Sequence, residues 1–190
     1  MRIEEHLYFA PGIRFEQVDL EGPELPNQFQ LRITGFYIDP AEKLAQRGDV
    51  FASGVLLVCC LDAMARFWFG GGSKKRFISI VNKKIESFIN NYDLSERFYN
   101  DVRCGLVHES RIKNRGEFSL DFQSTIKCID NIVFVNPKSL AQEVRAALDS
   151  YVDSFNDNPI KRDKLANAIR KDFPYELGLP VDKVPNTEEP

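Results

Sequence analysis

Arg103 and His108 are the residues of this sequence whose types and spacing are best suited to chemistry. They lie five residues apart in the segment RCGLVH (103–108), and His108 is one of only two histidines in the chain. A histidine accepts and donates protons near neutral pH. An arginine guanidinium binds a phosphate through two parallel hydrogen bonds. Together, these two side chains could promote the cleavage of RNA without a metal ion.

Such a reaction places three demands on the protein. A base must take the proton of the ribose 2′-OH, an acid must protonate the leaving oxygen, and a cation must stabilise the charge that grows on the phosphate. His108 suits proton transfer and Arg103 suits the phosphate. Because one histidine cannot easily do both proton transfers in one step, we expect a symmetric homodimer with two copies of each residue around one groove.

A purely structural role for the same pair stays open. A histidine near the C-terminus of a helix interacts favourably with the helix dipole. In that case Arg103 would pair with a nearby acid such as Asp101 or Glu109.

The charge of the chain limits how it can bind RNA. The net charge is -3 and the pI about 5.5, whereas a protein that binds nucleic acid mainly by charge is basic. Any RNA contact must therefore be local. The predicted loop after His108 carries Arg111, Lys113 and Arg115, which are candidates for binding RNA phosphates beside the site. A solvated basic loop is the alternative.

No metal site and no cofactor are predicted. The four cysteines form no C-x-x-C pair and are expected to be buried, reduced thiols. The two histidines are too far apart for zinc-ligand spacing. The segment 70–75 (GGGSKK) lacks the spacing of a P-loop and is expected to be a turn between helices.

A cytoplasmic protein without a membrane association is expected. The first residues lack the apolar region of a signal peptide. The longest uncharged run, Val50 to Leu61, is shorter than the ~20 apolar residues that cross a bilayer.

Hydrophobic periodicity predicts a mainly α fold. Residues 1–39 are expected to form a β or extended N-terminal segment, because 29–33 and, more weakly, 13–16 alternate apolar and polar residues. Asp39, Pro40 and Glu42 then predict the start of a helix. Residues 158–190 are expected to hold a short helix, at 161–172, and a tail without structure from Pro180.

Between these ends, residues 40–157 are predicted to form a helical bundle. Residues 49–69 are apolar on nearly every side and predict a central helix buried all round. Further helices are expected at 74–92, from 93 past His108, and from Asn136-Pro137 onward, giving about four to five in all. Within the central helix, Asp62 and Arg66 are spaced for an ion pair. Residues 118–122 and 132–135 predict a small β-hairpin.

Residues 98–109, with Arg-x4-His near the end of the third long helix, resemble the HEPN superfamily. The resemblance covers residues 40–157. It implies a dimeric helical bundle and a metal-independent endoribonuclease with Arg103 and His108 as catalytic residues. It also implies a setting in defence or stress, such as a toxin with a cognate antitoxin or regulatory protein. The sequence departs from the family at Cys104, where active members often have a polar residue, and at Ser110, where toxins often have tyrosine. A catalytically inactive HEPN-like module that binds a partner protein or a nucleotide is therefore the alternative.

Overall fold

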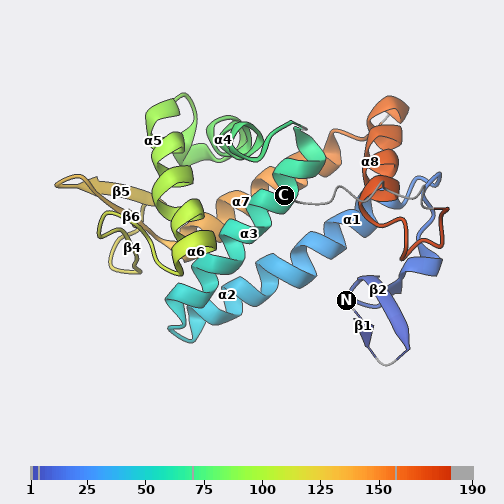
Figure 1. Ribbon diagram of the computed structural model, residues 1–190, viewed down its shortest axis with the longest axis horizontal. Coiled ribbons are helices and arrows are strands. Elements are labelled where there is room, and N and C mark those ends of the chain that lie inside the picture. The colour runs from blue at the N-terminus through green and yellow to red at the C-terminus, as the bar shows by residue number, and fades with distance from the viewer. Residues whose placement is uncertain (1, 4, 70, 157, 181–190) are drawn as a thin grey trace, which may run out of the picture.

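A long apolar helix, α3 (Val50–Trp68), lies at the centre of the molecule, and the other helices pack around it (Figure 1). The structure is a computed structural model, and it describes residues 2–3, 5–69, 71–156 and 158–180. Two small β elements lie at opposite ends of the bundle. The predicted fold class, a mainly α helical bundle, is confirmed.

The N-terminal part of the chain contains more helix than the sequence predicted. Three short strands, β1 (Arg2–Ile3), β2 (His6–Ala10) and β3 (Ile13–Arg14), pair antiparallel in the order β1-β2-β3 and lead into a 3-10 turn, η1 (Phe15–Gln17). The strand predicted at 29–33 is wrong, because α1 (Leu25–Ile33) is an α-helix. Leu25, Phe29 and Ile33 follow each other at four-residue intervals and are buried, so helical burial overrides the short alternating pattern.

The helix start predicted at Asp39 lies inside a longer helix. A π-helical segment, η2 (Thr34–Ile38), joins α1 to α2 (Asp39–Gln46), so one helical rod crosses the boundary expected between residues 39 and 40. Pro40 has no N–H, and its ring would clash with a preceding carbonyl in a regular α-helix. The wider π turn directly before Pro40 is where such a disturbance is normally absorbed.

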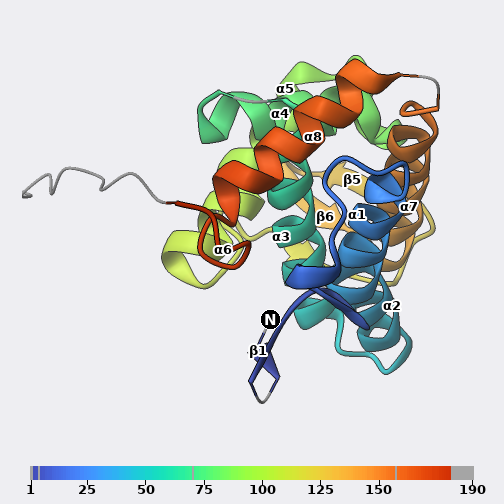
Figure 2. The ribbon, with the colours of Figure 1, turned by 90° about the vertical axis from the view of Figure 1, so that its right-hand side faces the viewer.

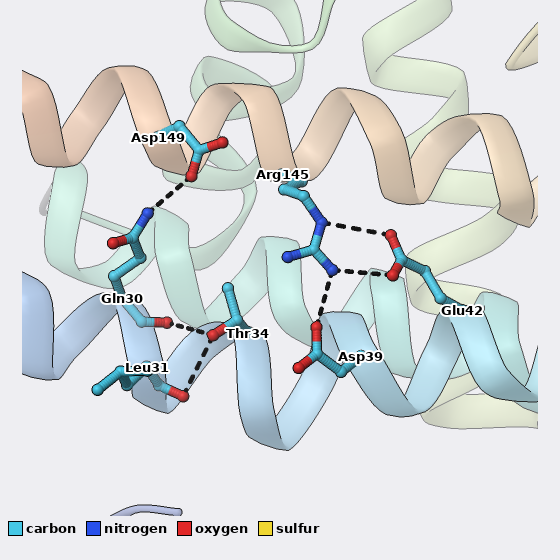
Figure 3. A network of polar contacts seen from close by, with 7 residues as sticks. All are labelled: Gln30, Leu31, Thr34, Asp39, Glu42, Arg145 and Asp149. Atoms are coloured by element: carbon cyan, nitrogen blue, oxygen red, sulfur yellow. Dashed lines mark hydrogen bonds and ion pairs between the residues drawn. The ribbon is translucent and has the colours of Figure 1, made fainter.

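Asp39 and Glu42 do not cap a helix end but hold α2 against α7 (Pro137–Asp153). Arg145 in α7 bonds Asp39 Oδ1 at 2.8 Å and Glu42 Oε2 at 2.9 Å (Figure 3). One helical turn further along α7, Asp149 accepts a hydrogen bond from Gln30 Nε2 of α1 at 2.7 Å. Burial acts to lower the pKa of Arg145, but its bonds to the two carboxylates outweigh burial and raise it.

The central helix α3 is confirmed, although it is not buried on every side. Leu57, Leu61 and Met64 on its inner face are at most 1% exposed. On its outer face, Phe51 is 52% exposed and Cys59 is exposed. By length and composition α3 is the one helix among the described residues that is apolar enough to cross a membrane, yet it packs here against α2, α4 (Ser73–Lys84) and α7.

The turn predicted at 70–75 is shorter than expected, because α4 already begins at Ser73; Gly71, before it, has a φ of +87° that favours glycine. Five apolar residues at helical spacing predict one buried face for the helix expected at 74–92. Phe77, Val81, Ile85 and Phe88 are buried as predicted, but Tyr92 is 56% exposed and begins α5. The helix α4 itself is shorter than expected. It ends at Lys84 and is followed by a 3-10 turn, η3 (Glu86–Phe88).

The helix that carries Arg103 and His108 is continuous but contains a second π-helical segment. It comprises α5 (Tyr92–Arg97), η4 (Phe98–Arg103) and α6 (Cys104–Glu109). Its N-cap is Asn91, whose side chain accepts a hydrogen bond from the Leu94 N–H, so the helix begins one residue before the start predicted at 93. The helix ends where Ser110 takes a left-handed conformation, directly after the motif.

The predicted β-hairpin forms from different strands. β5 (Ile126–Ile129) and β6 (Ile132–Val135) are antiparallel partners, whereas β4 (Glu117–Phe118) pairs with β6 in parallel. Phe118 instead packs on Gly54 of α3, where any Cβ would collide with its ring. This close approach attaches the small sheet to the central helix.

Two helices complete the bundle. α7 begins at the predicted Asn136-Pro137 pair, where the Asn136 side chain accepts from the Lys138 N–H at 2.9 Å. α8 (Pro159–Asp172) crosses one end of the bundle (Figure 2), and Leu165 and Ile169 join the core. One continuous core therefore extends from β2 to α8, and no separate core divides the chain at 39 or 157. The predicted tail lies almost wholly outside the described residues.

Candidate functional site

Arg103 lies at the end of the π-helical segment η4, with its guanidinium against α3. Its Nη2 donates to Asp62 Oδ2 at 2.7 Å and to Ser73 Oγ at 3.2 Å. The guanidinium carbon lies 5.5 Å from the centre of the Tyr99 ring, within the range of a cation–π contact. Because three elements hold this side chain and only 13% of it is exposed, its position is fixed before any ligand arrives.

The ion pair predicted between Asp62 and Arg66 is wrong. The Asp62 carboxylate bonds Arg103 and lies 3.8 Å from Arg76, while Arg66 pairs with Asp172 in α8. The sequence does contain a signal for this arrangement. Asp62 is the only charged residue between Asp49 and Arg66 in an apolar helix, and a carboxylate in such a setting requires a cation from another element.

The Asp62–Arg103 pair is partly buried and electrostatically coupled. Burial acts to lower the pKa of Arg103, but the hydrogen bond and the charge of Asp62 outweigh burial, so the pKa is raised. Asp62 Oδ1, Arg76 Nε and Arg103 Nε are buried without a hydrogen-bond partner in the protein. The cluster therefore retains unused donor capacity on two arginines and unused acceptor capacity on one acid.

His108, in contrast to Arg103, has an exposed side chain without a bonding partner among the described residues. It lies one turn further along, in the last turn of α6, and is exposed. In the described part of the chain, no hydrogen bond or ion pair joins its side chain to another residue. Its neighbour Val107 is 55% exposed. The imidazole is thus free to exchange protons with solvent or with a bound molecule.

No hydrogen bond or ion pair joins the side chains of Arg103 and His108, which are both among the described residues. The acids considered for a structural pair, Asp101 and Glu109, bind other residues. Asp101 accepts from the Asn114 side chain at 2.8 Å and lies 3.6 Å from Arg97. Arg103 therefore pairs with neither of these two acids, but the structural alternative of a pair with an acid is realised by Asp62.

The basic loop after His108 is anchored through Glu109. Arg111 Nη2 lies 2.6 Å and Lys113 Nζ 2.8 Å from the Glu109 carboxylate. The bond to Lys113, reinforced by the charges of both basic residues, holds the pKa of Glu109 below its usual value. Arg115 is exposed and makes no bond to another described residue. Of the three predicted RNA-binding residues, two are thus partly neutralised and one is not.

The backbone of the same loop packs directly on the motif helix. The Lys113 N–H donates to the Asp101 carbonyl at 2.9 Å, and Ile112 is buried. Gly105 permits this approach, because a Cβ there would collide with the Arg111 carbonyl. The glycine in the motif is therefore explained by packing.

The described residues contain no cluster of three or more side chains able to hold a metal ion. The prediction of buried thiols is correct for Cys60, where burial raises the pKa, but wrong for Cys59 and Cys128, which are exposed. Burial also raises the pKa of the Cys59 thiol, with a smaller contribution from the charge of Asp62. A raised pKa disfavours the thiolate that nucleophilic or metal-binding chemistry requires.

Comparison of this chain with models of protein families, with curated proteins and with solved structures finds no match. The interpretation of the site therefore rests on its residues and their geometry.

Proposed function

We propose that this chain is a metal-independent endoribonuclease of HEPN type that acts as a homodimer in the cytoplasm and leaves a 2′,3′-cyclic phosphate. The observation that carries the proposal is the contrast between the two motif residues. His108 is exposed and unbonded, as a proton-transfer group must be. Arg103 is held in place by Asp62, Ser73 and Tyr99, as a group that stabilises charge should be.

In this mechanism the histidine moves protons and the arginine contacts the phosphate. His108 accepts the 2′-OH proton, the 2′ oxygen attacks the adjacent phosphorus, and the bond from phosphorus to the 5′ oxygen breaks. The second histidine of the dimer protonates that 5′ oxygen. Arg103 stabilises the charge on the phosphate, and its buried bond to Asp62 limits the movement of the guanidinium.

A second copy of the chain supplies what one copy lacks. Each chain carries one motif histidine, so the second proton transfer requires His108 of a second chain. The exposed Val107 beside His108 gives this surface an apolar residue that a self-contact would cover. A cognate antitoxin or other regulatory protein would act by covering the same surface.

A second candidate function is a non-catalytic module that binds a partner protein or a nucleotide. The observation in its favour is the Asp62–Arg103 pair, in which the positive charge already has a carboxylate partner at 2.7 Å. In this case Arg103 would be a structural residue, and only the exposed surface around His108 would take part in binding.

Incubation of the pure protein with mixed RNA in EDTA separates the two functions. We expect cleavage that leaves a cyclic phosphate, slowed about 10²–10⁴-fold by His108→Ala, the usual contribution of general acid–base catalysis. Removal of charge stabilisation in Arg103→Ala should slow it comparably. His6→Ala removes the other histidine and is the matched control, which should cleave at the wild-type rate. Uncut RNA would favour the binding module, and equal cleavage by all variants would contradict the proposed site.

A further inference from the structure

A groove between α4 and α5 gathers positive charge on a protein whose net charge is -3. We call it the lysine groove; Lys74, Lys75, Lys83, Tyr92, Ile78 and Glu96 are among its lining residues, and its volume is about 540 Å³. This volume lies within the usual range of ligand pockets, roughly 300–1,000 Å³. A solvated lysine face, the ordinary explanation for such residues, does not require a groove.

Two of the three lysines keep their charge available. Lys74 is engaged, because its Nζ lies 2.6 Å from Glu96. Lys75 is exposed and makes no bond to another described residue, and Lys83 lies 5.7 Å from the centre of the Phe69 ring without a carboxylate partner. Eight residues of α-helix separate these two lysines, which corresponds to about 12 Å along α4. Two available positive charges thus lie along one side of the groove.

The other side of the groove supplies an aromatic ring. Tyr92, the first residue of α5, lines the groove and is 56% exposed, whereas Ile78 of α4 lines it as a largely buried residue. An exposed ring next to a row of cations is the arrangement by which proteins hold single-stranded nucleic acid, because every base can stack and every phosphate carries charge. An acidic peptide would use the lysines but would gain little from the ring.

The groove also leads to the candidate catalytic residue. Lys74 directly follows Ser73, the first residue of α4, whose Oγ accepts a hydrogen bond from Arg103. The N-terminal end of this 12-residue helix carries partial positive charge. A phosphate backbone that follows α4 toward its N-terminus would therefore pass Lys83 and Lys75, then the Lys74–Glu96 pair and the helix N-terminus, before it reaches Arg103.

From these observations we propose that the lysine groove binds single-stranded RNA, with Lys75 and Lys83 on phosphates and Tyr92 stacked on a base, and guides it to Arg103. The proposal that RNA is guided toward Arg103 rests on the proposed nuclease function, but binding of RNA in the groove can be tested without cleavage. It also explains how an acidic protein can hold RNA, since the attraction is local.

The test measures binding of a fluorescent 2′-O-methyl RNA oligonucleotide, which lacks the attacking hydroxyl, to the full chain. The double variant Lys75→Glu/Lys83→Glu should bind at least about tenfold more weakly. The slope of log affinity against log salt should be shallower by about 1.4, because about 0.7 is lost for each phosphate contact with a single strand. Tyr92→Ala should weaken binding about tenfold through lost stacking and leave the salt slope unchanged.

The matched control is Lys161→Glu/Lys164→Glu, the same charge change on exposed lysines of α8, at the other end of the molecule from α5 (Figure 1). It should bind within about twofold of the wild type. The groove is disproved if both double variants weaken binding equally, if the wild type does not bind, or if a poly-glutamate peptide of equal charge competes as well as RNA.

Failure of the groove and failure of the nuclease give different results. If the wild type binds RNA through the groove but never cleaves an unmodified strand, the groove stands and the proposed activity does not. If His108→Ala abolishes cleavage while the lysine variants bind and cleave as the wild type does, the activity stands and the groove does not.

Discussion

Replacement of Asp62 by asparagine tests whether the carboxylate in the central helix holds Arg103. The substitution keeps the size of the side chain and an oxygen acceptor, but it removes the negative charge. Breaking a fully buried ion pair costs about 3–5 kcal/mol. Here the Asp62 side chain is 24% exposed and that of Arg103 13% exposed, so part of the lost charge is replaced by water. We expect a loss of about 2 kcal/mol in the free energy of unfolding.

The matched control uses the partner that the sequence suggested. Arg66 pairs with Asp172, but the Arg66 side chain is 53% exposed, and exposed pairs contribute at most about 1 kcal/mol. Arg66→Gln should therefore cost about 0.5 kcal/mol. If Asp62 paired with Arg66 instead of Arg103, the two substitutions would have similar, small effects.

Urea unfolding followed by circular dichroism measures both values, and a double-mutant cycle isolates the pair. Asp62→Asn combined with Arg103→Gln should cost less than the sum of the single changes by about 1 kcal/mol, because each single change leaves the other residue without its partner. Strict additivity, or a loss for Asp62→Asn no larger than for Arg66→Gln, would refute the assigned contact.

Three further predictions concern the core and the loop after the motif. Leu57→Ala should lower the free energy of unfolding by about 2–5 kcal/mol, because Leu57 is fully buried in α3; urea unfolding measures this loss. Gly105→Ala should cost about 1–3 kcal/mol, since the new methyl group meets the Arg111 carbonyl; Gly72→Ala, where a Cβ meets only open space and φ is -66°, is the control without a collision. Glu109→Gln should expose loop amides, including that of Lys113, to faster hydrogen exchange at neutral pH. Because the pKa of Glu109 is lowered by Lys113 and Arg111, the stabilisation is present above the ordinary pKa of 4.5 and is lost as pH falls through the folded value; a difference between the two proteins that grew on acidification would contradict this origin.

The elements that could be predicted are those with strong local signals. The central helix was evident from a run of apolar residues too long for a strand, and the start of α7 from Asn136 before Pro137. The strand predicted at 29–33 failed because five alternating residues are a weak signal. The same residues, read from Leu25, fit a helical period equally well.

For the candidate site, the sequence predicts the helix that carries the motif but not the partner of Arg103. The position of Arg103 and His108 on one helix, and the end of that helix soon after His108, follow from the sequence. The partner of Arg103 does not, because Asp62 lies 41 residues away in the sequence, and Arg66 offered a nearer cation at helical spacing. The π-helical segments in η2 and η4 also left no pattern in composition or periodicity.

The charge at position 62 also sets α3 apart from a membrane-spanning helix. By length and composition alone, this 19-residue helix is apolar enough to cross a bilayer. An aspartate near the middle of such a segment disfavours insertion by about 2.5–3.5 kcal/mol. The carboxylate that fixes Arg103 therefore also makes α3 a poorer membrane segment, and a hydrophobic residue at this position would remove that penalty together with the partner of Arg103.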